Sequence, residues 1–363
     1  MGFFTRGGEG DAEQAESLAR IEAGGIPSGA QARLKALGTE GSLFTSGLSV
    51  NEFALLEQLG PQPLAQVMGA SVVRTGWQYL PALEPVVAVN AGLSYYVAAM
   101  TGSKRSWRSR YTEPSQAQVR NYQWRTEVVC ELDVLTDAWS TARRRALDRL
   151  SEEALQVGAD AVVGVHLRRG DHDLGRGTIE YVVTGTAIRL PNSAHTSSPT
   201  LTDVSVQDYW RLLKAGHEPV GFVATTAVVF ASPARMTRIR RLRTTSQNQE
   251  LEEISHGFHT AREAVRARLR SQVCDAHGAG AIGVEFLHSV QREKLALASS
   301  LQSRDQRGWH RSRLGVPYFV SGHSDFGRRG WVITMHAAGT AVRRRQGPSQ
   351  YPVKTAMRIG ASR

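Results

Sequence analysis

The stretch Gly158-Ala159-Asp160-Ala161-Val162-Val163-Gly164-Val165 decides the fold, because a long amphipathic pattern runs into it and an apolar run marked by glycine leaves it. A second version lies 119 positions later, as His277-Gly278-Ala279-Gly280-Ala281-Ile282-Gly283-Val284. A helical period that changes to a short β-branched run is typical of a helix followed by a strand. Each stretch therefore predicts a join between a long helix and a strand.

The helix before each stretch is predicted from apolar residues at helical spacing. Adding 119 to every position of the first stripe gives a second apolar stripe without a gap. The matched stripes are Leu132, Leu135, Trp139, Ala142, Ala146, Leu150, Ala154 and Val157, and Leu251, Ile254, Phe258, Ala261, Val265, Leu269, Val273 and Ala276. Helix and strand thus form one duplicated unit.

A shorter helix and further strands are duplicated as well. Ser49 and Glu52 form a capping box, and an apolar run of strand length follows at 64–73. The same pattern recurs from Ser205 with an offset of 156. A closing strand in each copy carries a shared triplet, Gly185-Thr186-Ala187 and Gly339-Thr340-Ala341. Each copy is predicted to be an α+β repeat with a long helix packed over a small sheet made from three strands.

The offset between the copies falls from 156 to 119 and then returns to 154, so insertions are expected at 73–121 and after Phe286. Long inserts of this kind are expected at the surface or at contacts with other chains. The predicted organisation is a flexible N-terminal arm at 1–41, a first repeat at 42–190, a linker at 191–201, a second repeat at 202–345 and a basic C-terminal tail at 346–363.

Composition limits the class of protein. The 363 residues carry 44 Lys and Arg against 33 Asp and Glu, for a formal net charge of +11, which favours anionic partners where the charge is concentrated. Two cysteines, Cys130 and Cys274, are too few for a disulfide framework, and no signal peptide opens the chain, so a cytoplasmic location is expected. The most apolar window, 86–100, is too short to span a membrane.

On these motifs the chain resembles the YbjQ-like family, which is named for heavy-metal binding. The resemblance rests on the helix that ends in the 158–165 stretch and on the strand that closes on Thr184-Gly185-Thr186-Ala187. The second copy departs from the pattern at His277, where the family has Gly, and at Ala224-Thr225, where the first copy has the family-like Met68-Gly69. The resemblance implies two tandem copies of a small α+β fold whose members assemble into rings, commonly pentamers. It brings no established reaction.

Cys274 and His277 are the candidate metal ligands, because their i, i+3 spacing on a helix would let them share one transition metal ion. Zinc needs four donors, or three and a water, and no Cys-x-x-Cys or His-Glu-x-x-His motif supplies the others. The residues alone favour a buried thiol and a helix-terminal histidine. The metal site is kept as a candidate because the family name suggests it.

Two further sequence patterns bear on function. Residues 278–283 spell G-x-G-x-x-G, but they follow a helix and enter a strand, the reverse of a dinucleotide-binding loop. Arginine-rich clusters at 104–110, 235–243, 304–313 and 343–345 favour anionic partners such as nucleic acids, whereas Arg143-Arg144-Arg145 are expected on a solvated helix face beside Asp148.

The sequence contains no catalytic constellation. The predicted function is therefore a non-enzymatic, oligomeric scaffold or ligand-binding protein, with anion or nucleic-acid binding through the arginine-rich inserts as the alternative. Self-association into a closed ring is expected, with five chains and two stacked layers favoured over three chains in a pseudo-sixfold ring.

Overall fold

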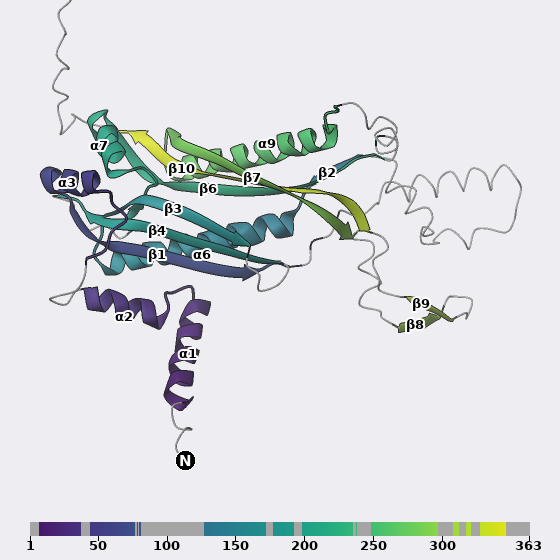
Figure 1. Ribbon diagram of the computed structural model, residues 1–363, viewed down its shortest axis with the longest axis horizontal. Coiled ribbons are helices and arrows are strands. Elements are labelled where there is room, and N and C mark those ends of the chain that lie inside the picture. The colour runs from purple at the N-terminus through teal and green to yellow at the C-terminus, as the bar shows by residue number, and fades with distance from the viewer. Residues whose placement is uncertain are drawn as a thin grey trace, which may run out of the picture.

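The computed structural model describes residues 7–37, 44–76, 78, 80, 127–171, 177–191, 198–234, 237, 248–296, 308–311, 317–320 and 327–345. The fold is mixed α+β, with helices on two four-stranded sheets (Figure 1). No helix in these ranges is long and apolar enough to cross a membrane.

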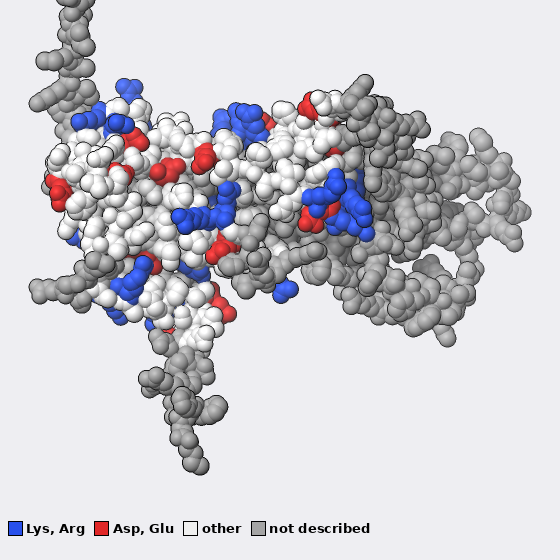
Figure 2. Space-filling model, viewed as in Figure 1, with Lys and Arg blue, Asp and Glu red and all other residues white. Residues whose placement is uncertain are grey.

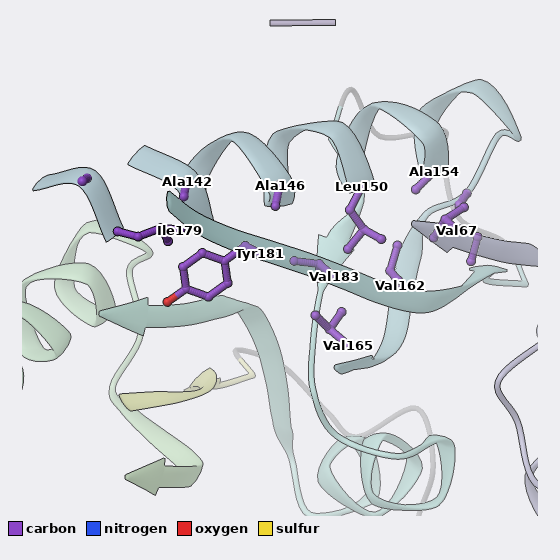
Figure 3. Packing of buried hydrophobic residues seen from close by; sticks show 13 residues of the cluster. Val67, Ala142, Ala146, Leu150, Ala154, Val162, Val165, Ile179, Tyr181 and Val183 are labelled. Atoms are coloured by element: carbon purple, nitrogen blue, oxygen red, sulfur yellow. The ribbon is translucent and has the colours of Figure 1, made fainter. Parts of the chain in front are cut away.

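The first sheet has the strand order β1-β4-β3-β5. Strand β4 (Thr178–Arg189) lies antiparallel to both β1 (Gln62–Arg74) and β3 (Ala161–Asp171), and the short β5 (Thr200–Leu201) runs parallel to β3. Helix α6 (Asp133–Gln156) packs the part of its predicted apolar stripe that begins at Trp139 on one face of this sheet (Figure 3). The small side chains of that stripe, Ala142, Ala146 and Ala154, let the helix approach the strands closely.

The second sheet has the order β2-β6-β10-β7. Its strands are β2 (Val128–Glu131), β6 (His217–Ser232), β10 (Gly327–Arg344) and β7 (Gly280–Ala296), all antiparallel to their neighbours. Helix α9 (Glu252–Asp275) covers one face through Ala261 and Val265, which pack on alternate residues of β6 and β10. In Figure 1, α9 lies over this sheet and α6 lies against the other.

The three duplicated strands have the same order in both sheets, and the sheets share their irregularities. Gly164 and Gly283 have φ angles of 62° and 63°, a left-handed conformation that glycine adopts without strain, and each lies where the strand register shifts. Across from these bulges, a Cβ on Gly185 would lie 2.5 Å from a methyl carbon of Val162, and one on Gly339 would lie 2.8 Å from the Ile282 carbonyl oxygen. The duplicated triplet thus provides glycine where the neighbouring strand lies too close for a side chain.

The smaller helices follow their sequence signals. Helix α3 (Val50–Leu59) begins with the predicted Ser49–Glu52 capping box and ends at Gly60, and α7 (Val206–Lys214) is capped by Ser205. Residues expected in the flexible arm form α1 (Gly7–Glu22) and α2 (Ser28–Leu37), and Arg33 of α2 forms an ion pair with Glu153 of α6 at 2.6 Å. A small hairpin pairs β8 (Gly308–Arg311) with β9 (Pro317–Val320).

The sheets differ from the expectation in one respect, because each has four strands rather than three. Strand β2 precedes α6 in the chain but pairs with β6 of the second sheet, whereas β5 precedes α7 but pairs with β3 of the first. The insertion expected after Phe286 also begins as regular structure, since β7 continues to Ala296 and pairs there with Gly327. The insert at 73–121 lies largely outside the described residues.

Candidate functional site: the junction between the two sheets

The exchanged strands create a junction between unlike surfaces of the two halves. In the first half, the edge of β3 is covered by β5 and α7, so that Val206 and Tyr209 of α7 pack on Ala161 and Val163. In the second half, the edge of β6 is covered by β2. At this junction, β2, α6 and β3 of the first half contact β6, α7 and the residues before α7 in the second half. We call these the presenting side and the receiving side of the junction.

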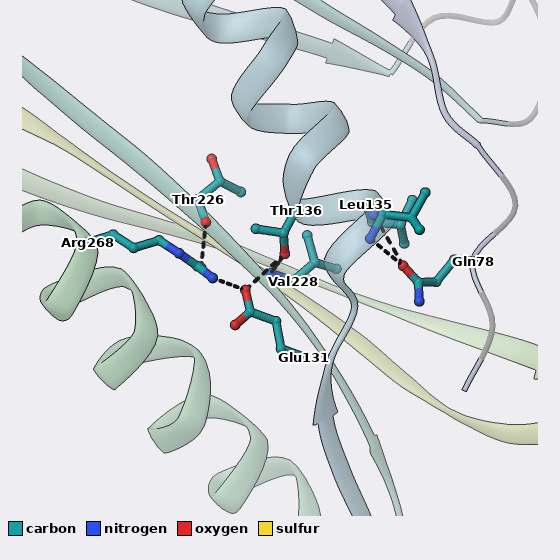
Figure 4. A network of polar contacts seen from close by, with 8 residues as sticks. Gln78, Glu131, Leu135, Thr136, Thr226, Val228 and Arg268 are labelled. Carbon is teal, nitrogen blue, oxygen red and sulfur yellow. Dashed lines mark hydrogen bonds and ion pairs between the residues drawn. The ribbon is translucent and has the colours of Figure 1, made fainter. Parts of the chain in front are cut away.

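A polar network joins the start of α6 to the second half (Figure 4). Thr136 accepts a hydrogen bond from the Val228 amide at 3.0 Å and donates one to Glu131 at 3.1 Å. Arg268 of α9 forms an ion pair with Glu131 at 2.6 Å and donates to the Thr226 carbonyl at 3.1 Å. The network therefore connects β2, α6, β6 and α9.

Gln78 completes this end of the junction. The N-terminal turn of α6 has no side-chain cap of its own. The Gln78 side-chain oxygen instead accepts from the amides of Val134 and Leu135, at 2.9 and 3.2 Å. A residue far away in the sequence thus satisfies donors that a helix start leaves open.

A second network is centred on His336 of β10. The hydroxyl groups of Tyr181 and Thr226 lie 3.3 and 2.9 Å from its Nδ1, and Arg143 of α6 donates to the Thr226 oxygen at 2.8 Å. The Trp139 ring stacks edge-on against His336, with ring centroids 4.9 Å apart. Burial, with the nearby positive charge of Arg169 and Arg143, lowers the pKa of His336 to about 3.

This chemistry fits a structural connection better than a catalytic centre. A histidine with a pKa near 3 is neutral at physiological pH and is a weak general base. Arg143, expected on a solvated face, is instead buried, and burial lowers its pKa. Its buried guanidinium donates to Thr226 from the opposite side of the junction. The residues thus orient the two sheets relative to each other.

A groove of about 470 Å³ runs beside this network between α6 and α9. Its lining includes Arg143, Arg144 and Arg268 together with Asp148 and Gln272. On the face shown in Figure 2, basic side chains are likewise interspersed with acidic ones. The groove therefore has more basic than acidic groups, but two of its arginines already have partners, Arg143 in Thr226 and Arg268 in Glu131.

The predicted ligands Cys274 and His277 both lie at the C-terminal end of α9. Cys274 is exposed, so the expectation of a buried thiol was wrong, because its position faces away from β6 and β10. His277 is also exposed and has a left-handed φ of 54°, at the position where the first half has Gly158 with φ 72°. Within the described ranges, no group of three or more His, Cys, Asp or Glu residues could hold a metal ion. These two donors do not fit the four-ligand zinc site.

The other cysteine, Cys130, is partly buried. Burial and the negative charge of Asp133 raise the pKa of Cys130 to about 11. The free thiol is therefore protonated at neutral pH. Cys130 packs at the junction among Leu132, Val228 and Phe230.

The remaining sequence motifs have mixed outcomes. The G-x-G-x-x-G run lies between the end of α9 and the start of β7, in the order that excludes a dinucleotide-binding loop. The arginine clusters at 104–110 and, for the most part, at 235–243 and 304–313 lie outside the described residues. Within the cluster at 343–345, Arg343 forms an ion pair with Glu218.

Sequence reasoning missed the network around His336. His336 was one of several scattered histidines, and its partners come from Arg143, Tyr181 and Thr226 in three other elements. One signal was present, since Arg143 follows Ala142 of the apolar stripe and lies four residues after Trp139. That position places Arg143 at the border of the buried face.

The chain is similar to known proteins of two kinds. Residues 121–191 match a YbjQ family described as "putative heavy-metal-binding", a range that excludes Cys274 and His277. A UPF0145 protein in each of two Halobacterium salinarum strains is 40% identical over 60 residues, which is 16% of this chain and 56% of the relative. The chain thus spans just over half the length of these relatives. No solved structure matches.

A longer match comes from Mycobacterium tuberculosis. Its encapsulin nanocompartment protein Rv1762c is 30% identical to this chain over 252 residues, which is 67% of this chain and 77% of that protein. The alignment therefore extends well beyond the YbjQ match at 121–191. The chain belongs to the family of the encapsulin nanocompartment protein Rv1762c.

Proposed function

We propose that this chain is a non-enzymatic structural protein that assembles with further copies of itself as a component of a protein compartment. The observation that carries the proposal is the distribution of exposed apolar side chains. Of the twelve large apolar side chains exposed in the described part of the chain, eight belong to two surfaces. Contiguous apolar exposure of this kind marks sites of protein association.

The first of these, the α3–β1 surface, contains Phe44, Val50, Phe53, Met68 and Val72. The second, the α9–β7 surface, contains Leu251, Phe286 and Val290, whereas Leu287 points to the opposite face of β7. They belong to different sheets, and β1 and β7 are edge strands. The name of the mycobacterial relative, a nanocompartment protein, agrees with a role in assembly.

The proposal includes a second YbjQ-like copy at 202–345. Support comes from hydrogen bonds that recur at equivalent positions. Glu153 accepts from the Met68 amide at 2.9 Å, and Gln272, which lies 119 positions after Glu153, accepts from the Ala224 amide at 3.0 Å. Arg149 donates to the Ala70 carbonyl, and Arg268 donates to that of Thr226. The same helix therefore contacts the same strand in each half.

Two finer expectations remain proposals. Metal binding at Cys274 and His277 would require ligands from outside the described residues or from another copy. The sequence favours five chains in stacked layers, and three chains in one ring is the alternative. The junction between unlike surfaces supports the alternative, because repeating it would alternate first and second halves within one ring.

Light scattering of the untagged, full-length protein at several concentrations tests the proposal. A mass that is a multiple of the 39.7 kDa chain is expected, and its value separates five chains from three. The mass of a single chain at every concentration would overturn the assembly function. Negative-stain electron microscopy of the same sample would show whether the assembly is closed.

A further inference from the structure

Equivalent residues of the two short helices lie in very different surroundings. In α7, Val206 is 4% exposed and Tyr209 is 9% exposed, because both pack on the edge of β3. The equivalent residues of α3, which lie 156 positions earlier, are Val50 and Phe53. They are 85% and 36% exposed. The apolar character is kept in α3, but the surface that covers it in α7 is missing.

The first strand of each half shows the same contrast. Val228 of β6 is 1% exposed and Ala224 is 6% exposed, since the start of α6 and its neighbours cover this edge. The equivalent residues of β1 are Val72, which is 51% exposed, and Met68, which is 44% exposed. The α3–β1 surface therefore matches the receiving side of the internal junction.

The opposite side of the junction also has an open counterpart. Leu132, which precedes α6, is fully buried against Val228, whereas its equivalent before α9, Leu251, is 38% exposed. Strand β3 is covered by β5, whereas β7 pairs within the described residues with β10 alone. Phe286 of β7 is 45% exposed. The α9–β7 surface therefore matches the side that the first half presents to the second.

The backbone is already arranged for the same contact. At the internal junction, the Gly164 and Val165 amides donate to the carbonyls of Val204 and Thr202, at 3.0 and 2.9 Å. The receiving segment is held by Thr340, whose hydroxyl accepts from the Asp203 amide at 3.1 Å. In the first half, the Thr186 hydroxyl accepts from the Gly47 amide at the same distance of 3.1 Å. The segment at 44–48 is thus positioned as 200–204 is.

We propose that the α3–β1 surface of one copy binds the α9–β7 surface of a second copy, and that this contact reproduces between chains the junction found within the chain. Residues 44–48 add a short parallel strand to the edge of β7, and α3 covers that edge as α7 covers β3. Leu251 packs on Val72 as Leu132 packs on Val228. This inference rests on the proposed assembly function, which it deepens by naming the surfaces.

The partner is a second copy of this chain, because both halves of the contact are present on one molecule. Within the chain, the equivalents of these two surfaces are bound to each other. A head-to-tail contact of this kind uses unlike surfaces, so every added copy leaves the same pair of surfaces open until the assembly closes.

A variant with Val50→Asp and Phe53→Asp tests the contact. Both side chains are exposed, so the fold should persist, as checked by circular dichroism and thermal melting. We expect self-association to weaken by about 100-fold or more, since two charges would be buried in an apolar contact. Leu18→Asp is the matched control, because Leu18 is 56% exposed on α1 outside both surfaces, and this variant should assemble as the wild type does.

Cross-linking gives a second, independent readout on the assembled protein. Both native cysteines are first removed by Cys130→Ser and Cys274→Ser. New cysteines are then placed by Thr45→Cys in one chain and Ala281→Cys in another. Thr45 and Ala281 are the equivalents of Leu201 and Val162, which are paired across the internal junction. Mixing the two single-cysteine chains, one carrying a size tag, should give a disulfide-linked heterodimer on mild oxidation. A control chain that carries Gln291→Cys, farther along β7, should give no such heterodimer with the Thr45→Cys chain.

The outcomes separate this inference from the assembly function. A wild-type protein that stays monomeric would overturn both. A wild type that assembles while the double aspartate variant assembles equally well, or while the Thr45 and Ala281 cysteines fail to cross-link, would overturn the named contact and leave assembly standing. Loss of assembly in the variant together with the specific cross-link supports the contact.

Discussion

Gly69→Ala tests how closely β1 and α6 approach each other. Gly69 is buried, and a Cβ there would lie 2.7 Å from the Leu150 amide nitrogen and 3.0 Å from the Ala146 carbonyl carbon, with the Ala146 oxygen closer still. All three atoms belong to helix backbone, so no side chain can rotate away and α6 itself must move. Overpacking against a rigid element costs about 1–3 kcal/mol or more. The gain from a less flexible unfolded chain is about 0.4–1 kcal/mol, so we expect a net loss of about 2 kcal/mol.

Urea unfolding at one fixed protein concentration measures this loss, because assembly would otherwise shift the midpoint. Gly221→Ala is the matched control, since Gly221 lies in β6 and nothing is within 4 Å of a Cβ at that position. The control should equal the wild type or be slightly more stable. If Gly69→Ala unfolds within roughly 0.5 kcal/mol of the control, the close packing of α6 on β1 is incorrect.

Three further changes test the junction and the sites. The pKa of His336 is about 3 in the folded state against 6.5 in the unfolded state, so the folded state binds fewer protons. The free energy of unfolding should therefore fall by up to about 2 kcal/mol from pH 6.5 to 5. His336→Asn should flatten this pH dependence, and an unchanged slope would show that His336 does not cause it. Glu153→Ala should cost about 2 kcal/mol by leaving a backbone amide unpaired, whereas Glu153→Gln should change little, as measured by urea unfolding. Metal titration followed by calorimetry should show any transition-metal binding abolished by Cys274→Ser with His277→Ala, and binding that survives would remove these residues as ligands.

The repeated elements could be predicted because local patterns specify them. The stripe from Leu132 to Val157 and its copy gave α6 and α9, and the capping residues at Ser49 and Ser205 gave the starts of α3 and α7. The exchange of β2 and β5 between sheets could not be predicted, because both are short and their partners lie far away in the chain. Pairing of such strands depends on tertiary contacts rather than on their own propensity.

The junction shows the same limit for polar residues. Arg143 was predicted to be solvated together with Arg144 and Arg145. The three residues are consecutive in α6, so they point in different directions around the helix. Burial follows from what the second half places beside α6, and Thr226 with His336 supplies the partners that a buried guanidinium needs. The network that satisfies this guanidinium draws on four elements, α6, β4, β6 and β10. Sequence periodicity describes one element at a time and therefore cannot reveal it.

Joining two copies in one chain makes the two junctions energetically unequal. The internal junction forms at a high effective concentration, whereas a contact between chains must also offset the freedom lost on association, estimated at about 4–15 kcal/mol. The surfaces between chains should therefore be more apolar than their internal counterparts, and the residues agree. The α3–β1 surface has Phe44, Phe53 and Met68 where the second half has Thr200, Tyr209 and Ala224. A chain that only had to fold would gain nothing from exposing Phe44 and Met68 in place of Thr200 and Ala224, so these exchanges are best explained by a second copy that covers them.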